Sequence, residues 1–372
     1  MASEREALPD SLRIGGQELH GKDAFLEALE TERDPFTARV LDFCARWCGP
    51  GETMLLHTSG STGTPKPFLA GKREMAASAA MTVRRLGLRA GDRALLCLPL
   101  DYIAGQMVVV RAMLAGLELV PVTPSRHPFA GLSGSVDFAA LVPLQVKASL
   151  EVPEEREALR AVRELIIGGA AVDPGLASEL KGFPHEVWST YGMTETLSHV
   201  ALRPLSGLEA GSWYEPLDGV AVSSTERGTL AIEAPAIGVS RIETNDLVLF
   251  RPGSTRFRIL GRVDNVIDSG GIKVPAEQVE EALRDSIPVP FAIAPVPDPD
   301  LGSAVAAVVE GEPGMPLPDF RAVMKEKGLS PYWKPRVAVF VRKLPETRTG
   351  KLDRKGIRLA AANAPSGLKR KL

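Results

Sequence analysis

A stretch rich in glycine and hydroxyl side chains lies near the start of the chain and ends in a lysine, at Thr58-Ser-Gly-Ser-Thr-Gly-Thr-Pro-Lys66. Glycines let a backbone come close to an anion, while N–H groups and hydroxyls donate to its oxygens and a lysine adds positive charge. Flexible linkers share this composition, but the apolar run Thr53–His57 before it and the Pro65-Lys66 end favour a phosphate-binding loop. Its candidate contacts are Thr58, Ser59, Gly60, Ser61, Thr62, Gly63 and Lys66.

A second motif, Ser189-Thr-Tyr-Gly-Met-Thr-Glu195, combines an aromatic ring, a hydroxyl and a carboxylate. Alone it is compatible with an ordinary junction of strand and turn, but together the two motifs resemble those of the adenylate-forming superfamily. That superfamily includes acyl- and aryl-CoA synthetases, luciferases and the adenylation domains of peptide synthetases. The resemblance implies that adenine stacks on Tyr191, that Thr194 contacts a nucleotide phosphate and that Glu195 binds Mg²⁺, which prefers hard oxygen ligands. The same resemblance implies that Gly192 and Met193 also contact the nucleotide.

Three further segments resemble the superfamily in the same order along the chain. Gly168-Gly169-Ala170 resembles the turn that flanks adenine and the acyl group, which implies an acid contact for Gly168 and a nucleotide contact for Gly169. Thr244-Asn-Asp246 resembles the element whose aspartate, here Asp246, binds the ribose hydroxyls. Residues 261–273 resemble the hinge region, which implies a hinge residue at Asp264 and a nucleotide contact at Arg262.

The segment 344–354 resembles the loop that holds the superfamily's catalytic lysine, here Lys351. A lone lysine is usually a solvated surface residue, but the ordered motifs before Lys351 overturn that interpretation. All the matches together span about residues 53 to 358.

The resemblance implies two half-reactions in one site. ATP first converts a carboxylate, which is a poor electrophile, into an acyl-adenylate whose leaving group is AMP. Charge grows on the α-phosphate in that step, where Mg²⁺ and a positioned lysine stabilise it. The thiol of coenzyme A then attacks the acyl carbon and expels AMP. In the superfamily a small C-terminal domain turns about the hinge residue between the steps and withdraws the lysine.

Within the superfamily, residues 98–116 most resemble the compact bacterial o-succinylbenzoate–CoA ligases of menaquinone biosynthesis. Their substrate is an aromatic dicarboxylate, so its second carboxylate needs a fixed cation, and an arginine offers a bidentate match. Arg111 is a lone charge in an apolar helical segment, at the family's position relative to Gly105-Gln106. An arginine paired with an Asp or Glu of the protein itself explains the residues equally well, and the family resemblance favours the substrate anchor.

Other polar residues near these motifs are candidates for the acid's keto group or ring carboxylate. They include Gln145, Ser198 and His199, although a histidine is more often a satisfied structural residue. The predicted substrate set also contains Gly105 and Ser189.

The chain departs from the superfamily pattern at several places. Tyr102 stands where histidine is common in the superfamily, so no role of that histidine is assigned to Tyr102. Glu346 stands where a lysine is common. Asn245 replaces the usual glycine of the ribose motif, a change that we expect to be harmless because Asp246 persists. Only about fifty residues precede the phosphate loop, so we expect part of the outer subdomain to be missing. A homodimer in which a second subunit covers this flank is compatible with that expectation.

The elements around these motifs predict an α/β fold with mainly parallel sheets covered by helices. Apolar runs alternate with amphipathic segments, as expected for a parallel sheet with crossover helices. A β-rich subdomain follows at about 219–261, and a small mobile α+β domain ends the chain. We therefore predict a large domain at 1–261, shortened at its N-terminus, and a small one at 262–372. The expected strands are 53–57, 93–98, 117–122 and 164–167, and the expected helices are 22–48, 73–86, 104–115 and 154–162.

Composition narrows the class of protein. Forty-four Lys and Arg against 46 Asp and Glu give a formal charge of −2, which provides no long-range attraction for nucleic acid or an acidic membrane. Residues 102–122 approach the length of a membrane span, but Gln106, Arg111 and Glu118 interrupt them, so we interpret them as core. Three cysteines without paired motifs and a start unlike a signal peptide favour a cytoplasmic protein.

Two alternatives remain beside an o-succinylbenzoate–CoA ligase. One is a CoA ligase for another aryl or acyl acid, and the other is a non-catalytic homologue that binds a nucleotide. Acyl-adenylate formation with a panel of acids distinguishes the three.

Overall fold

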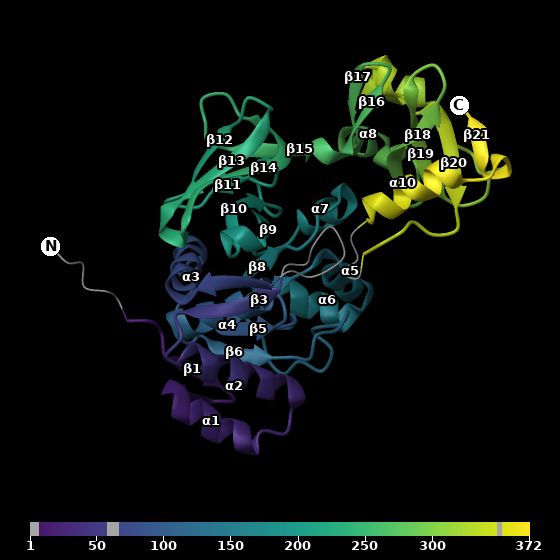
Figure 1. Ribbon diagram of the computed structural model, residues 1–372. Helices are drawn as coiled ribbons and strands as arrows, with labels where there is room; N and C mark the ends of the chain where they lie inside the picture. The colour runs from purple at the N-terminus through teal and green to yellow at the C-terminus, as the bar shows by residue number, and fades with distance from the viewer. Residues whose placement is uncertain (1–6, 58–66, 348–351) are drawn as a thin grey trace. The chain divides into compact units, whose positions relative to one another are not determined.

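The computed structural model describes residues 7–57, 67–347 and 352–372 (Figure 1). The predicted contacts at Thr58–Lys66 and the predicted catalytic Lys351 therefore lie outside the described residues. The chain forms two compact units. The first consists of Met1–Val222, Ile232–Ile242 and Arg251–Phe257, and the second of Ser223–Ala231, Glu243–Phe250 and Arg258–Leu372.

A nine-stranded sheet organises the first unit, and its six central strands are parallel. The strands at the two margins run antiparallel to their neighbours. The alternation of apolar runs and helices therefore predicted the sheet type correctly. Across the sheet the order is β11 (Glu215–Pro216), β10 (His199–Pro204), β9 (Glu186–Gly192), β8 (Glu164–Ile167), β7 (Phe138–Leu141), β5 (Arg93–Leu96), β6 (Glu118–Pro121), β1 (Ser11–Ile14) and β2 (Gln17–His20).

Among the described residues of this unit, seven helices accompany the sheet. The predicted helical region 22–48 proves to be two of them, because Pro35 starts a new helix that Asp34 caps. Three helices pack on one face, where Leu165 and Ile167 of β8 join one apolar core with residues of α5, α6 and α7. The helices are α1 (Gly21–Thr31), α2 (Pro35–Trp47), α3 (Lys72–Leu86), α4 (Ile103–Ala115), α5 (Pro143–Glu151), α6 (Pro153–Arg160) and α7 (Pro174–Leu180).

The segment 102–122 forms the core of the first unit, as predicted. Its helix α4 is buried from Gly105 through Met113, and β6 follows it in the sheet. A helix that is apolar on every side is expected at such a position. Within the described ranges, no helix combines the length and the apolar character needed to cross a bilayer.

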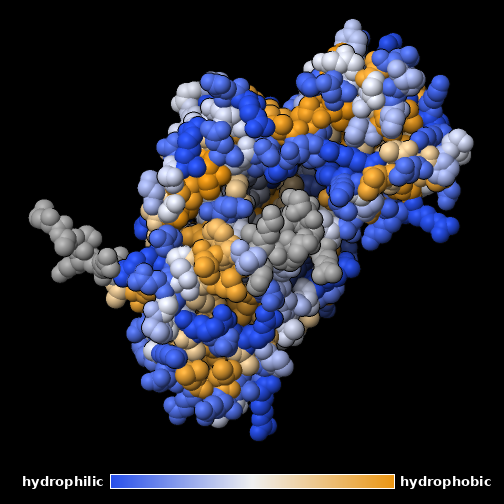
Figure 2. Space-filling view, in the orientation of Figure 1, coloured by the Kyte–Doolittle hydropathy of each residue, from blue (hydrophilic) through white to orange (hydrophobic). Residues whose placement is uncertain are grey.

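One sequence prediction needs correction at the phosphate loop. The expected order was strand, polar loop and helix, but a second strand, β4 (Pro67–Gly71), pairs antiparallel with β3 (Thr53–His57) before α3 begins. The outer face of this hairpin exposes Leu55 and Leu69, which face each other across the two strands. Figure 2 shows hydrophobic surface in this region. A second subunit over this flank stays a prediction.

A four-stranded sheet follows, as the turn-rich pattern at 219–261 predicted. Its order is β12 (Ala221–Ser224), β13 (Thr229–Ala234), β14 (Val239–Phe250) and β15 (Phe257–Arg262).

The remainder of the second unit is an α+β structure, also as predicted. Alternating residues of its four-stranded sheet face two cores, one shared with α8 and α9 and the other with α10. Its elements are β16 (Val266–Ser269), β17 (Ile272–Pro275), α8 (Ala276–Leu283), β18 (Phe291–Asp298), β19 (Gly302–Glu310), α9 (Phe320–Glu326), β20 (Val337–Val341), α10 (Arg354–Asn363) and β21 (Lys369–Lys371).

Glu164, the first residue of β8, makes the stability of the first unit depend on pH. Burial raises the pKa of Glu164 to about 7, and the neighbouring Glu186 adds to the shift, although the Trp188 indole donates a hydrogen bond to its carboxylate at 3.3 Å. The folded chain thus holds a proton here that the unfolded chain releases at lower pH. Stability from this group is present at acidic pH and is lost as the pH rises through about 7.

We therefore expect Glu164→Gln to stabilise the protein at pH 8 by about 1 kcal/mol while leaving stability near pH 5 little changed. The neutral amide keeps an acceptor for the Trp188 indole. Urea unfolding at both pH values measures the difference. Glu151→Gln, at an exposed position in α5, is the control that should change neither value. If Glu164→Gln changed the free energy of unfolding equally at both pH values, ionisation of Glu164 would not be the cause of the change.

Candidate functional site

The two ends of the predicted phosphate loop are held together by the hairpin. His57 ends β3 and Pro67 begins β4, and the two residues are partners in the antiparallel register. Nine residues, 58–66, lie between these partners in the sequence. The fold thus supplies closely spaced anchors on either side of the segment of glycine and hydroxyl residues.

Two predicted motifs meet where β8 and β9 end. These strands are parallel neighbours with Ile167 opposite Ser189, so Gly168 follows β8 beside the last residues of β9. The Thr190 hydroxyl donates to the Ile167 carbonyl at 3.3 Å, and a Cβ on Gly168 would lie 2.5 Å from that hydroxyl oxygen. Ligands of open α/β sheets bind at the carboxyl ends of the strands. The structure therefore brings Gly168 and Gly169 to the same sheet edge as Tyr191.

A tight turn follows β9 and presents Thr194 and Glu195. The turn is the 3₁₀ helix η1 (Thr194–Thr196), in which the buried Thr196 hydroxyl accepts from the Met193 N–H at 2.9 Å. Gly192 is required because a Cβ there would lie 2.2 Å from the Ser198 carbonyl oxygen. Leu197 closes the turn with a φ of 60°, an uncommon conformation for a residue with a side chain.

Glu195 fits the predicted Mg²⁺ ligand. Its side chain is exposed and takes part in no ion pair among the described residues. The described ranges also contain no cluster of three His, Cys, Asp or Glu side chains placed for a metal. This donor set matches Mg²⁺ held by one carboxylate together with phosphate oxygens.

An aromatic cluster holds the Tyr191 ring. Tyr191 meets Phe257 edge-on at 5.5 Å between centroids and lies 5.8 Å from Tyr214, which stacks on Phe257. Ser189 is buried and shares a hydrogen bond of 3.0 Å with the Tyr214 hydroxyl. Ser189 thus supports the aromatic cluster, and its contact with the acid stays a prediction.

Arg111 is buried in α4, and no carboxylate among the described residues pairs with it. Only 1% of the residue is exposed, one Nη donates to the Ser198 hydroxyl at 2.7 Å, and its Nε finds no acceptor in the described residues. Burial lowers the pKa of Arg111 to about 9. An internal Asp or Glu partner, the alternative that the sequence left open, is not found within the described ranges. A buried cation of this kind requires an anion from elsewhere.

His199 lies beside Arg111 and is neutral. Burial, and then the nearby Arg111 cation, hold the pKa of His199 well below its usual range. Its Nε2 lies 3.1 Å from the Thr82 hydroxyl and its Nδ1 lies 3.4 Å from the Ser198 hydroxyl. The structure thus brings together three predicted substrate residues, Arg111, Ser198 and His199.

Two other predicted substrate residues have structural partners. The Gln145 amide donates to the carbonyls of Cys97 and Ser125 and accepts from the Val142 N–H. Gln145 therefore fixes the backbone, and the prediction that it faces the acid is not supported. Gly105 is buried where a Cβ would lie 2.4 Å from the Pro99 carbonyl oxygen, so close packing alone requires a glycine there.

The second unit contains Asp246, which is predicted to bind the ribose, and Asp264, the predicted hinge residue. Arg262 donates to Asp246 at 3.1 Å and to Asp264 at 3.0 Å, and it links the two carboxylates. The Asn245 amide also donates to Asp264, at 3.3 Å. The residue that departs from the ribose motif therefore contacts the predicted hinge carboxylate.

The same unit anchors both flanks of the segment that contains Lys351. Glu346, before the segment, forms an isolated antiparallel β-bridge with Leu352, which follows it. The Asp353 N–H also donates to the Pro345 carbonyl at 2.8 Å. After it, Arg354 donates twice to Glu280 of α8, at 2.5 and 2.8 Å. The ends of the predicted catalytic loop are thus tied to the body of the second unit.

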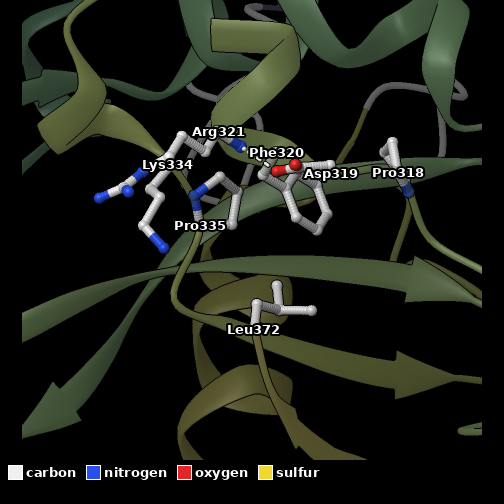
Figure 3. A pocket seen from close by; sticks show the side chains of 7 residues that line it. All are labelled: Pro318, Asp319, Phe320, Arg321, Lys334, Pro335 and Leu372. Atoms are coloured by element: carbon white, nitrogen blue, oxygen red, sulfur yellow. Dashed lines mark hydrogen bonds between the residues drawn. The ribbon is translucent and has the colours of Figure 1, made fainter.

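A pocket of about 130 Å³ elsewhere in the second unit contains none of the predicted site residues (Figure 3). Its Asp319 carboxylate caps α9 by accepting from the N–H groups of Arg321 and Ala322. The pocket is lined by Pro318, Asp319, Phe320, Arg321, Lys334, Pro335 and Leu372.

Sequence reasoning missed three kinds of supporting residue. Thr82 gave a readable signal, since it is a polar residue on the buried stripe formed by Met75, Ala79 and Leu86. Thr196 followed directly on a recognised motif. Tyr214 and Phe257 gave no local signal, because they meet Tyr191 only through strand pairing.

Comparisons with known proteins bear on this arrangement. Residues 22–226 match a family model described as "AMP-binding enzyme". A Mycobacterium tuberculosis protein named "Probable 2-succinylbenzoate–CoA ligase" is 28% identical over 365 residues, which cover 90% of this chain and 91% of that protein.

Two solved structures are also similar. An acyl-CoA synthetase (AMP-forming)/AMP-acid ligase II-like protein from Dyadobacter fermentans has a TM-score of 0.62 and 36% identity, over 91% of this chain and 97% of that one. The o-succinylbenzoate CoA synthetase from Bacillus subtilis, in complex with its acyl-adenylate intermediate, has a TM-score of 0.68 and 22% identity, over 84% of this chain and 69% of that one. At the lower identity the likeness concerns the fold alone.

Proposed function

This chain belongs to the family of AMP-binding enzymes, and from that premise we propose that it is an AMP-forming acid–CoA ligase that activates o-succinylbenzoate. The observation that carries the choice of acid is the buried Arg111, whose Nε has no acceptor within the described residues. A monocarboxylic acid uses its only carboxylate in the reaction. A dicarboxylic acid has a second one to neutralise this cation.

Arginine suits this task because its planar guanidinium can meet a carboxylate with two parallel hydrogen bonds. The Ser198 hydroxyl accepts a hydrogen bond from one Nη of Arg111. Other N–H groups of the guanidinium can then bind the ring carboxylate. The Mycobacterium tuberculosis relative, named for the same acid and aligned over most of both chains, supports this choice.

We assign the nucleotide to the motifs at the sheet edge and in the second unit. The loop Thr58–Lys66 would bind the triphosphate, Tyr191 would stack on adenine and Asp246 would bind the ribose. Mg²⁺ would be held by Glu195 and would neutralise phosphate charge. Thr194 would donate its hydroxyl to the α-phosphate. Further contacts with the nucleotide would come from Gly169, Gly192, Met193 and Arg262, while Gly168 would contact the acid.

The proposed reaction has two displacements. A succinyl carboxylate oxygen attacks the α-phosphorus of ATP, and pyrophosphate leaves. The sulfur of coenzyme A then attacks the acyl carbon, its proton is released, and AMP leaves with the electron pair of the broken C–O bond. Lys351 would stabilise the first transition state. Rotation of the small domain at 262–372 about Asp264 would then exchange the lysine for the thiol.

Incubating the purified protein with ATP, Mg²⁺ and a panel of acids tests this proposal. We expect pyrophosphate release with o-succinylbenzoate, and its CoA thioester once coenzyme A is added. Turnover of a monocarboxylate but not of o-succinylbenzoate would show that the enzyme activates a different acid from the one proposed. If the protein bound ATP but released pyrophosphate with none of the acids, the proposed ligase activity would be overturned. A non-catalytic nucleotide-binding protein would then be favoured.

A further inference from the structure

A chain of hydrogen bonds leads from α3 to the guanidinium of Arg111. Thr82 of α3 lies 3.1 Å from His199 Nε2, and His199 Nδ1 lies 3.4 Å from the Ser198 hydroxyl. That hydroxyl lies 2.7 Å from Arg111 Nη2. Thr82 is fully buried, and His199 is only 6% exposed. Thr82 belongs to α3 and Arg111 to α4, while Ser198 directly precedes β10 and His199 begins it.

One arrangement of protons satisfies every contact in this chain, and it can be traced from the Arg111 end. A guanidinium can only donate, so the Ser198 oxygen accepts from Arg111. The Ser198 hydroxyl proton can then go to His199 Nδ1, which lies 3.4 Å away. In this arrangement Nδ1 carries no proton, and a neutral imidazole has its single N–H on Nε2. The Thr82 oxygen accepts that N–H.

The Thr82 end is compatible with the same arrangement. Its hydroxyl contacts the Ser78 carbonyl of the preceding helical turn at 3.4 Å. A carbonyl can only accept, so a Thr82 proton directed there leaves the Thr82 oxygen to accept from His199 Nε2. Both ends thus favour one tautomer of His199. In the other tautomer Thr82 would donate to Nε2 and give up the Ser78 carbonyl, and the Ser198 hydroxyl proton would have no acceptor among the described residues.

We propose that Thr82 is a positioning residue that, through His199 and Ser198, fixes the Arg111 guanidinium for the second carboxylate of the acid. This inference rests on the proposed function, because it assumes that Arg111 binds that carboxylate. Thr82 itself touches no substrate. Its effect is to make Ser198 an acceptor, so that one Nη is held and the remaining donors of Arg111 keep a single orientation.

Size alone is a competing explanation for Thr82, because α3 packs on α4 and a small residue is needed there. Thr82→Val separates the two, since valine keeps the shape of threonine but neither donates nor accepts. Thr82→Ser restores the hydroxyl with less volume. If the hydrogen bond matters, serine should act like the parent; if shape matters, valine should.

We expect Thr82→Val to raise the KM for o-succinylbenzoate about tenfold, since small displacements of a binding group have effects of this order. The KM for ATP and kcat should stay within a factor of about two. Thr82→Ser should remain close to the parent protein. With 4-oxo-4-phenylbutanoate, which lacks the ring carboxylate, the parent and Thr82→Val should not differ.

A spectroscopic readout tests the hydrogen bonds without any substrate. The ¹⁵N chemical shifts of the His199 ring should show the proton on Nε2 in the parent protein and in Thr82→Ser, and a mixture of tautomers in Thr82→Val. Assignment uses the loss of signals in His199→Gln. A parent protein with the proton on Nδ1 would overturn the inference. So would a folded Thr82→Val that keeps the parental KM for the acid.

Failure of the proposed function gives a different result. In that case the parent protein itself would not release pyrophosphate with o-succinylbenzoate, and the positioning role would fall with it. Turnover by the parent together with unchanged kinetics in Thr82→Val would overturn this inference alone.

Discussion

Arg111→Met is expected to raise the KM for o-succinylbenzoate about 100-fold while leaving the KM for ATP nearly unchanged. Losing one partner of a buried charge pair costs about 3 kcal/mol, and about 1.4 kcal/mol corresponds to a factor of ten. Steady-state pyrophosphate release, with one substrate varied at a time, measures both constants. Methionine keeps most of the length of the arginine side chain, so the packing of α4 is largely retained.

The same substitution should stabilise the protein in the absence of the acid. Arg111 is buried without a carboxylate partner in the described residues, and replacing an uncompensated buried charge by an apolar side chain removes a desolvation penalty. Urea unfolding should therefore show a higher midpoint for Arg111→Met than for the parent. Loss of acid binding with a gain in stability is the pattern of a binding residue; a residue that only supports the fold would lose both.

The substrate provides the matched control. With 4-oxo-4-phenylbutanoate the ring carboxylate is missing, so parent and Arg111→Met should have similar KM values. Arg111→Lys should fall between them for o-succinylbenzoate, because an ammonium keeps the charge but not the planar fork. A 100-fold effect on both acids would contradict a contact with the ring carboxylate.

The parallel sheet could be predicted because its strands carry their own signals. Glu164–Ile167 and Arg93–Leu96 are short apolar runs that follow recognisable helices or turns, and both form strands. The strand β4 could not be predicted in the same way. Pro67-Phe-Leu-Ala-Gly71 is short and bounded by proline and glycine, and it is a strand because β3 supplies its hydrogen-bonding partner. Phe138–Leu141 is a run of four that periodicity cannot distinguish from helix.

The candidate site divides along similar lines. Residue type and isolation drew attention to Arg111 as a lone charge in an apolar helix, and the family resemblance then favoured a substrate anchor over an internal partner. The partners of Gln145 could not be predicted, because Cys97 and Ser125 lie 48 and 20 residues away. Thr82 and His199 are 117 residues apart in the sequence, and only the fold makes them neighbours. Pairings of this kind are a property of the fold and leave little trace in the local sequence.

Asn245 shows that a departure from a motif can have a partner of its own. We expected this replacement of glycine to be harmless, and its amide donates to the predicted hinge residue Asp264. Arg262 reaches the same carboxylate. Motif comparison identified all three positions, but only the structure shows that Asn245 and Arg262 both contact Asp264.

Lys351→Ala is expected to lower the rate of adenylation by a factor of about 100 to 1000, the range found when one preorganised donor to a developing charge is removed. The physical reason is that this lysine would neutralise charge on the α-phosphate only in the first half-reaction. Pyrophosphate release in a single turnover, without coenzyme A, measures that step. Thioester formation from synthetic o-succinylbenzoyl-adenylate measures the second step and should remain close to the parent rate.

Lys355→Ala is the matched control, because Lys355 is an exposed lysine in α10, four positions from Lys351. It should leave both half-reactions unchanged if position rather than general positive charge matters. The flanks of the loop should survive the substitution of Lys351, since Arg354 stays bonded to Glu280 and Asp353 to the Pro345 carbonyl. A local change at Lys351 therefore need not disturb the second unit. Equal loss of both half-reactions in Lys351→Ala would contradict a lysine that acts in adenylation alone and is withdrawn before the thiol attacks.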